Sequence, residues 1–312
     1  MKLTRALSLV CILAFALLAA STPAQDQTAG PLRLPVHVHS ARSSAAAGTN
    51  AAEDPLQVKR TAEPLATEAC KYTFTTGSGA TLMTYCITVN GNFGGFESPA
   101  GVEMLHQGGA FEGYGVCDFS TNAEYFDYAY TDSANWNAPI LVTENSTEVK
   151  IERTTSDGLW TLTQVITKVT GMPPNAKIMM TLKNNSSVTK LVGLLRFAAF
   201  VPDHASASGN FNENYDGTGN SVWGYIPDFA TFSTTSDPNG LMLQNVGGAQ
   251  PPSISSPHSA FANKGEGGPH PCDSNANIGG TIINAEGSGV LFYAFQLTKE
   301  QSVTVTSRYI PF

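Results

Sequence analysis

The sequence predicts an all-β fold, a large antiparallel β-sandwich of two packed sheets with roughly ten or more strands. The clearest pattern lies in residues 147–201, where four strand-like stretches follow one another with turn residues between them. No stretch of any length has the periodicity of an amphipathic helix. Charged residues make up only 13% of the chain, and abundant Thr, Ser, Asn and Gly are typical of exported β-proteins.

The first two central strands are joined by a hairpin signal. Apolar and charged residues alternate over 148–154, which predicts a strand with one face in water. Asp157-Gly158 follows, and glycine accepts the positive φ of a type I′ turn at no steric cost. The second strand is expected over 159–169.

The next two strands differ in how apolar they are. Alternation over 177–182 again predicts a strand with one buried face. In 190–201 the apolar residues occupy both odd and even positions, as in a strand that is buried on both faces. Arg196 interrupts the second of these strands, and a guanidinium there is costly unless an acid pairs with it. We expect a structural ion pair at Arg196, with a ligand contact as the alternative.

The first 66 residues are expected to lie outside the folded domain. Lys2 and Arg5 precede the apolar run Ala6–Ala20, which predicts a secretory signal peptide over 1–24. Residues 25–66 are rich in Ala, Ser and Pro, and such a segment cannot bury enough apolar surface to fold, so a disordered leader is expected. Residues 67–312 are predicted to form a single β-sandwich domain.

Four cysteines remain after the one inside the signal peptide, and an even number in an exported chain predicts disulfides. A hairpin centred near Ser78 would place Cys70 and Cys86 opposite each other, close enough to bridge. That leaves Cys117 to pair with Cys272.

The stretch 90–118 is rich in glycine but has no phosphate-binding motif, so short strands and tight turns are expected there. It also contains Glu103, His106 and Glu112. A histidine between carboxylates can serve acid–base chemistry or bind a metal, but no spacing here is diagnostic of either.

Aromatic and acidic residues are interleaved over 122–136, a composition used by sugar-binding surfaces. Tyr125, Tyr128 and Trp136 are the ligand-binding candidates in this run. Ring faces pack on sugar C–H bonds, while carboxylates accept hydrogen bonds from hydroxyls. The alternative is that these rings simply pack in the core of a sheet.

A polar loop is expected over 202–225, directly after the most apolar strand, and long loops in compact domains often carry function. Asp203 and His204 open it, followed by Asp216, Trp223 and Tyr225, and all five are ligand-binding candidates. The oxygens of Asp203, Asp216 and Asn220 suit calcium, although the EF-hand pattern is absent, and no other cofactor is expected. Asp203 and His204 resemble part of a nucleophilic triad, but no G-x-S-x-G motif completes it.

The remaining strands are expected over 230–234, 241–244, 278–284, 290–297 and 302–310. His270 is a poor zinc candidate, because its neighbour Cys272 is assigned to a disulfide and no other ligands are evident. Apart from calcium in the 202–225 loop, we therefore predict no metal site.

Charge narrows the possible partners. The net charge is −8 and no basic stripe occurs, so we do not expect the protein to bind nucleic acid. No later stretch is apolar enough to span a membrane. The leading hypothesis is a secreted or periplasmic protein that binds glycan or a cell-surface component without catalysis. The alternatives are a carbohydrate-active enzyme using Glu103, His106, Glu112, Asp203 and His204, and a structural envelope or matrix protein.

Overall fold

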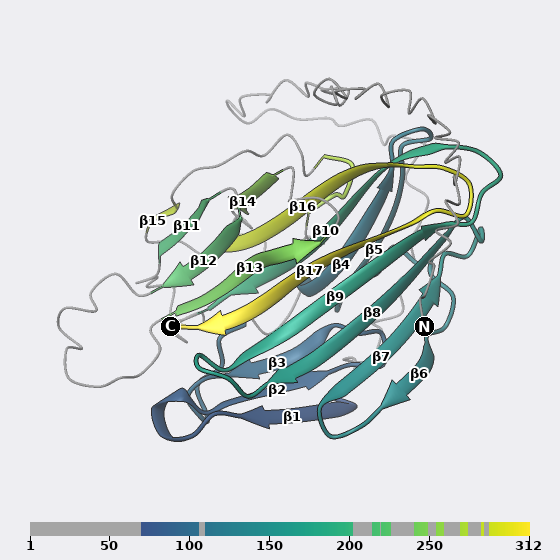
Figure 1. Ribbon diagram of the computed structural model, residues 1–312. Helices are drawn as coiled ribbons and strands as arrows, with labels where there is room; N and C mark the ends of the chain where they lie inside the picture. Colours follow the sequence, from purple (N-terminus) through teal and green to yellow (C-terminus); the bar gives the residue numbers. More distant parts are fainter. Residues whose placement is uncertain are drawn as a thin grey trace, which may run out of the picture. The chain divides into compact units, whose positions relative to one another are not determined.

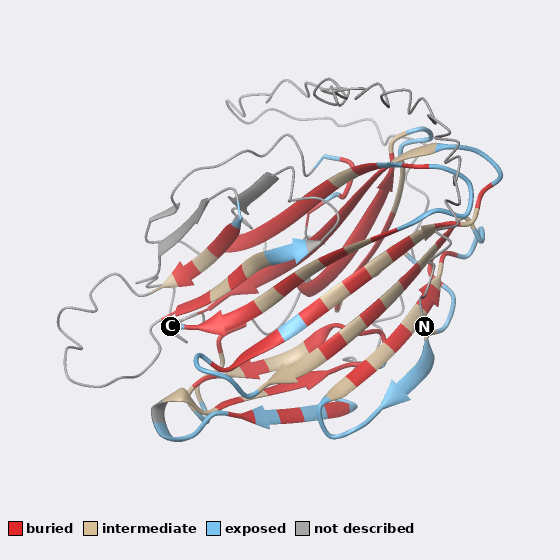
Figure 2. Cartoon of the chain, viewed as in Figure 1, coloured by how far each residue is buried: buried red, intermediate tan, exposed pale blue. Residues whose placement is uncertain are grey.

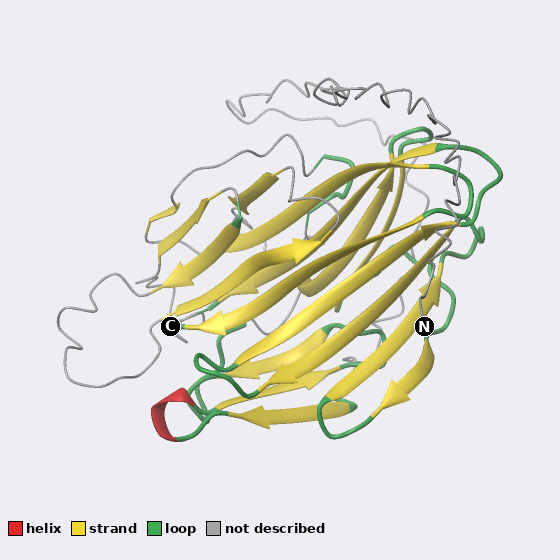
Figure 3. Cartoon of the chain, viewed as in Figure 1, coloured by secondary structure: helices red, strands yellow, loops and turns green. Residues whose placement is uncertain are grey.

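A computed structural model describes residues 70–105, 110–201, 214–218, 220–225, 240–248, 254–258, 269–273, 282–283 and 287–312. Within this part of the chain the fold is built from strands, with one short 3₁₀ helix, η1 (Gly79–Thr81), as Figure 3 shows. The strands form three antiparallel sheets. The predicted all-β fold class is confirmed, and the third sheet adds to the two that were expected.

The largest sheet has nine strands in the order β15-β11-β12-β13-β17-β9-β8-β7-β6. Figure 1 shows β17 running between β13 and β9 in its middle. The strand bounds are β6 (Ile140–Glu144), β7 (Glu148–Thr154), β8 (Trp160–Val169), β9 (Asn175–Asn184), β11 (Asn214–Thr218), β12 (Ser221–Tyr225), β13 (Gly240–Gly248), β15 (Ile282–Ile283) and β17 (Ser302–Pro311).

The second sheet has five strands in the order β14-β16-β10-β4-β5, and the third has three in the order β1-β2-β3. The bounds in the five-stranded sheet are β4 (Ala110–Asp118), β5 (Ala123–Ala129), β10 (Lys190–Phe200), β14 (Ile254–His258) and β16 (Gly287–Leu297). Those in the small sheet are β1 (Tyr72–Thr76), β2 (Met83–Ile87) and β3 (Phe93–Glu97).

The hydrophobic core lies between the sheets and draws on all three of them. Strand β8 alternates between buried and half-buried residues, so one face of the nine-stranded sheet points into the core and the other points outward (Figure 2). Strand β10 is buried on both parities from Val192 to Phe200, as its sequence predicted. It lies between β16 and β4 in its own sheet.

The chain changes sheets between β9 and β10. Asn184 ends β9, and its side-chain amide donates to the carbonyl oxygens of Val188, Leu297 and Thr298 at 2.9, 3.0 and 3.2 Å. Because a buried amide needs such partners, the Asn-Asn-Ser-Ser turn holds the corner between the two large sheets. Four strands that are consecutive in sequence therefore belong to both layers of the sandwich.

Both predicted disulfides are present. Cys70 and Cys86 are joined with their Cα atoms 5.4 Å apart. Cys117 in β4 is joined to Cys272, with a Cα–Cα distance of 4.9 Å and a sequence separation of 155. The second bridge ties a segment from late in the chain to β4, the strand beside the β5 edge of the five-stranded sheet.

The predicted loop over 202–225 needs correction in its second half. Strands β11 and β12 form an antiparallel hairpin there, with Asn214 opposite Tyr225 and Thr218 opposite Ser221. The glycines and asparagines of that stretch concealed its alternation. The signal peptide, the leader, Asp203, His204 and the strand expected over 230–234 lie outside the described residues. Among the residues that are described, no helix is long and apolar enough to cross a membrane.

Candidate functional site

Arg196 lies in a fully buried ion pair with Glu112, as the ion-pair hypothesis predicted. Its Nε donates to Glu112 Oε1 at 2.5 Å and its Nη2 to Oε2 at 2.7 Å, and both side chains have no exposed area. This bidentate geometry is the strongest form of an arginine–carboxylate contact.

Residues of the other two sheets also form hydrogen bonds with Arg196 and Glu112. The Tyr309 hydroxyl of β17 donates to Glu112 Oε1 at 2.7 Å, and the Phe93 amide of β3 donates to Oε2 at 2.7 Å. Gln164 of β8 accepts from Arg196 Nη1 at 2.7 Å. Burial raises the pKa of the Glu112 carboxyl, and Arg196 and the other donors oppose that rise. The cluster joins all three sheets and has no room for a substrate, so Glu112 is structural.

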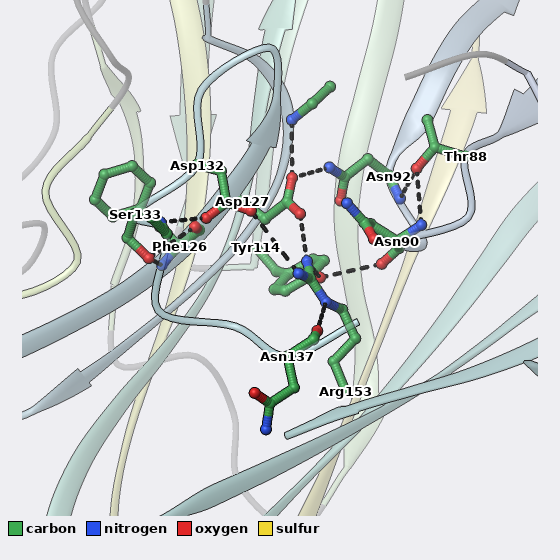
Figure 4. Close-up of polar contacts among 12 residues, drawn as sticks. Thr88, Asn90, Asn92, Tyr114, Phe126, Asp127, Asp132, Ser133, Asn137 and Arg153 are labelled. Carbon is green, nitrogen blue, oxygen red and sulfur yellow. Dashed lines mark hydrogen bonds and ion pairs between the residues drawn. The ribbon is translucent and has the colours of Figure 1, made fainter. Parts of the chain in front are cut away.

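A second buried cluster surrounds Asp127, the central residue of Figure 4. Arg153 Nη1 donates to Asp127 Oδ2, and the Asn92 amide donates to Oδ1. Arg153 Nη1 also donates to the Tyr114 hydroxyl at 2.9 Å, and its guanidinium lies 5.5 Å from the Trp136 ring centroid. This cluster links β5 to β7 through groups that are almost wholly buried.

Asp132 forms the partly exposed edge of that cluster. Its side chain is 14% exposed, and its Oδ2 lies 3.8 Å from Arg153 Nη2. Burial, followed by the nearby Asp127 carboxylate, raises the pKa of Asp132 to about 6. Ala129 and Ala134, on either side, have φ values of 66° and 57°, a left-handed conformation that non-glycine residues seldom adopt. A raised carboxyl pKa and backbone strain are both features found at functional sites.

The three aromatic candidates of the 122–136 run are part of the core, which corrects their predicted role. Tyr125, Tyr128 and Trp136 are 4%, 0% and 8% exposed. The Tyr125 hydroxyl donates to Asp157 Oδ2 at 2.5 Å, and the Tyr128 hydroxyl to the Pro269 carbonyl at 2.6 Å. Their ring faces are covered by protein, so they do not form an open surface for stacking sugars.

Of the predicted enzyme residues, two are described. Glu103 Oε1 accepts from the backbone amides of Phe96 and Leu105 at 2.8 and 3.0 Å, and Glu112 is committed to Arg196. The other three, His106, Asp203 and His204, lie outside the described residues, as does the side chain of Asp216. No group of three or more His, Cys, Asp or Glu among the described residues could hold a metal ion.

Sequence reasoning missed the role of Glu124. Its Oε1 accepts from the Cys272 amide at 2.9 Å, and its Oε2 lies 2.8 Å from His270 Nδ1. Together with the Cys117–Cys272 bridge, this carboxylate anchors residues 269–273 on β5. The contact joins positions far apart in sequence, so no local signal predicted it.

Trp223 and Tyr225 lie on the outward face of the nine-stranded sheet. They alternate on β12 with buried Val222 and Gly224, and both are half-buried. Directly paired antiparallel residues point to the same face, so Met242, opposite Trp223, also points outward. The two remaining aromatic candidates therefore share one surface.

Phe312 completes this group. Its backbone pairs with Gly240, which in turn is paired with Tyr225. A Cβ atom added at Gly240 would lie 2.7 Å from Phe312 Cζ and 3.0 Å from Tyr225 Cβ, so both side chains border the glycine. Phe312 is 41% exposed. We call the outward side chains of Trp223, Tyr225, Met242 and Phe312 the aromatic face.

A polar row adjoins the aromatic face. Gln244, two residues beyond Met242, is paired with Arg308 of β17, and its Oε1 accepts from Arg308 Nε and Nη2 at 2.9 and 2.7 Å. The sheet surface therefore presents aromatic rings beside an amide and a guanidinium. Such a combination suits a ligand that has both apolar faces and polar groups.

Comparisons with known proteins identify no family: no family model and no curated protein match the chain. Solved structures give loose likenesses. A bacterial glucoamylase complexed with acarbose is 13% identical with a TM-score of 0.47, over 79% of this chain and 33% of the other. A galactose mutarotase related enzyme from Lactobacillus acidophilus is 7% identical with a TM-score of 0.44, over 77% and 97%.

A polysaccharide lyase is 10% identical with a TM-score of 0.42, over 75% of this chain and 33% of the lyase. The chain thus spans about a third of the length of the glucoamylase and of this lyase. The assignment of the fold rests on the strand pairing in this chain and not on these likenesses.

Proposed function

We propose that the protein is an exported β-sandwich that binds glycan without catalysis, through the aromatic face. The observation that carries this proposal is the gathering of Trp223, Tyr225 and Phe312 on one outward surface beside Gln244 and Arg308. Most aromatic side chains of the described residues are buried, whereas these three gather on one partly exposed surface.

The chemistry of the surface suits a sugar. Aromatic rings offer apolar area at a low cost in side-chain entropy, and their faces pack on the C–H bonds of a pyranose. The Gln244 amide and the Arg308 guanidinium lie on the next row of the same surface and can bond hydroxyl groups. The strands of the sheet hold these groups at fixed spacing, so little conformational entropy is lost on binding.

The two disulfides support export. Such bridges persist in oxidising compartments and are rare in the cytosol, and the longer one joins β4 to the 269–273 segment. The predicted signal peptide agrees with this location.

Binding on a glycan array, followed by calorimetry, tests the proposal. Trp223→Ala and Tyr225→Ala should each weaken glycan binding by roughly tenfold or more, because stacked rings at binding centres contribute about 1–3 kcal/mol. The matched control is Met172→Ala, which removes an apolar side chain that is 85% exposed elsewhere. If the two aromatic variants bind glycan as well as the unaltered protein does, the aromatic face is not the site.

A second candidate function is a carbohydrate-active enzyme, and Asp132 favours it. A carboxyl with a pKa of about 6 beside a second carboxylate is suited to act as a general acid at neutral pH. Asp132→Asn should then abolish any polysaccharide cleavage while leaving glycan binding intact. Cleavage that persists in this variant would rule out Asp132 as the acid.

A further inference from the structure

Two cations stand directly opposite each other beside the aromatic face. Arg308 of β17 is paired with Lys177 of β9 on the outward face of the nine-stranded sheet. Lys177 is exposed and Arg308 is half-buried. Like charges at directly opposed positions of a sheet repel each other and destabilise it.

No carboxylate offsets this repulsion within the described part of the chain. The outward positions directly across from these two cations, or two residues along, are all neutral: Asn175, Met179, Gln244, Thr306, Ile310 and Thr167. The nearest acid of the same row, Glu148, is a further strand away, where the Thr167 hydroxyl donates to it at 3.4 Å.

Arg308 also retains donors for a ligand. Its Nε and Nη2 both bond Gln244 Oε1, which fixes the plane of the guanidinium, and no described residue accepts from its Nη1. A held guanidinium with free N–H groups is well suited to a carboxylate or a sulfate. The chain as a whole carries 25 acids against 17 basic residues, so this pair does not belong to a generally basic surface.

The spacing connects the cations with the rings. Neighbouring strands lie about 4.8 Å apart and outward residues about 6.8 Å apart along a strand, so Trp223 lies roughly 12 Å from Arg308 and roughly 16 Å from Lys177. Figure 1 shows the four strands concerned, β12, β13, β17 and β9, side by side. An oligosaccharide of a few rings spans that distance.

We infer that the ligand of this surface is an acidic glycan, with uronate carboxylates or sulfate groups bound between Arg308 and Lys177. The inference rests on the proposed function, because the rings of the aromatic face supply the rest of the contact. An anion placed between the two cations removes their mutual repulsion, and a neutral sugar does not. Binding is therefore selective for charge at this end of the surface.

The test uses oligogalacturonate and its carboxyl-reduced, neutral counterpart, together with an array of neutral, carboxylated and sulfated glycans. We expect the array signal to come from acidic glycans. Arg308→Gln and Lys177→Gln should each weaken binding of the strongest acidic ligand by up to roughly fivefold, since one charge contact at a surface is worth about that much. Added salt should weaken the unaltered protein more than either variant.

Two further variants make the result specific. Arg308→Lys keeps the charge and should retain most of the preference for acidic glycans. Lys183→Gln removes a cation from the same face of β9, where Lys183 is already paired with Glu300 at 2.5 Å, and should change nothing.

The outcomes separate the two proposals. Binding of neutral glycans that is lost in Trp223→Ala but unchanged in Arg308→Gln would overturn this inference and leave the proposed function intact. Absence of every glycan signal would overturn both. Acidic selectivity that survives loss of both cations would place the anion elsewhere and also overturn the inference.

Discussion

Asp132 has a carboxyl whose pKa is raised towards neutral pH. Its folded-state pKa of about 6 lies above its ordinary value of 3.8, because burial and Asp127 disfavour its ionised form. At low pH the carboxyl is neutral in both the folded and the unfolded state. As pH rises through 4 to 6, the unfolded state loses this proton first, so the free energy of unfolding falls, and the full penalty is present above about pH 6.

Asp132→Asn removes that penalty while keeping an oxygen to accept from the Ala134 amide. We expect this variant to unfold at a higher urea concentration above pH 6, by roughly 1–3 kcal/mol, and to match the unaltered protein near pH 4. Urea unfolding at several pH values provides the measurement. Equal stability at pH 7 would mean that Asp132 ionises there without cost.

The Arg196–Glu112 pair makes a different prediction, because both partners are buried. Arg196→Met leaves an uncompensated carboxylate in the core and should lower the free energy of unfolding by roughly 3–5 kcal/mol. Adding Glu112→Gln removes that charge and should restore part of the loss. Urea unfolding of the single and double variants measures both effects, and a loss below about 1 kcal/mol in the single variant would contradict the structural role.

At the scale of elements, strands with regular alternation were predictable from sequence. Strand β7 has the bounds that its alternation predicted, and β8 and β10 agree within one residue at each end. Local pattern sufficed there because β7 and β8 each bury one face, β10 is apolar on both faces, and turn residues stand between the strands. The cysteine pairing was also predictable, since the hairpin geometry left one connectivity.

Other elements were not predictable, for a physical reason. Strands β11 and β12 are short and mix glycine and polar residues with a few apolar ones. The pairing of β11 with β12, and of β12 with β13, is therefore fixed by tertiary contacts that no local pattern encodes. The candidate site was likewise only partly predictable from the sequence. Trp223 and Tyr225 stood out by composition, but Phe312 and Arg308 join them only through the pairing of β17 with β13.

The aromatic run of 122–136 shows the limit of composition as a guide to function. Rings beside carboxylates are as suitable for a core as for a sugar-binding surface, and the difference lies in which face the sheet covers. In this chain the rings of Tyr125 and Trp136 pack against each other, with centroids 6.3 Å apart.

At the scale of the whole molecule, the two faces of the largest sheet differ in what they carry. The inward face joins the three sheets through the core and the buried ion pairs. The outward face at β12, β13, β17 and β9 carries the partly exposed rings of the aromatic face and the opposed cations. The binding site that we propose therefore lies on a surface whose side chains can change without disturbing the core.

The most direct test of that assignment uses the 3 tryptophans of the chain as reporters. Trp136 and Trp160 are 8% and 0% exposed, whereas Trp223 is half-buried on the outward face. We propose recording the indole N–H resonances by NMR while an acidic oligosaccharide is added. The aromatic face predicts that the Trp223 signal shifts and saturates while the other two stay in place. Saturable binding that moves the Trp136 or Trp160 signal and leaves Trp223 unchanged would contradict it.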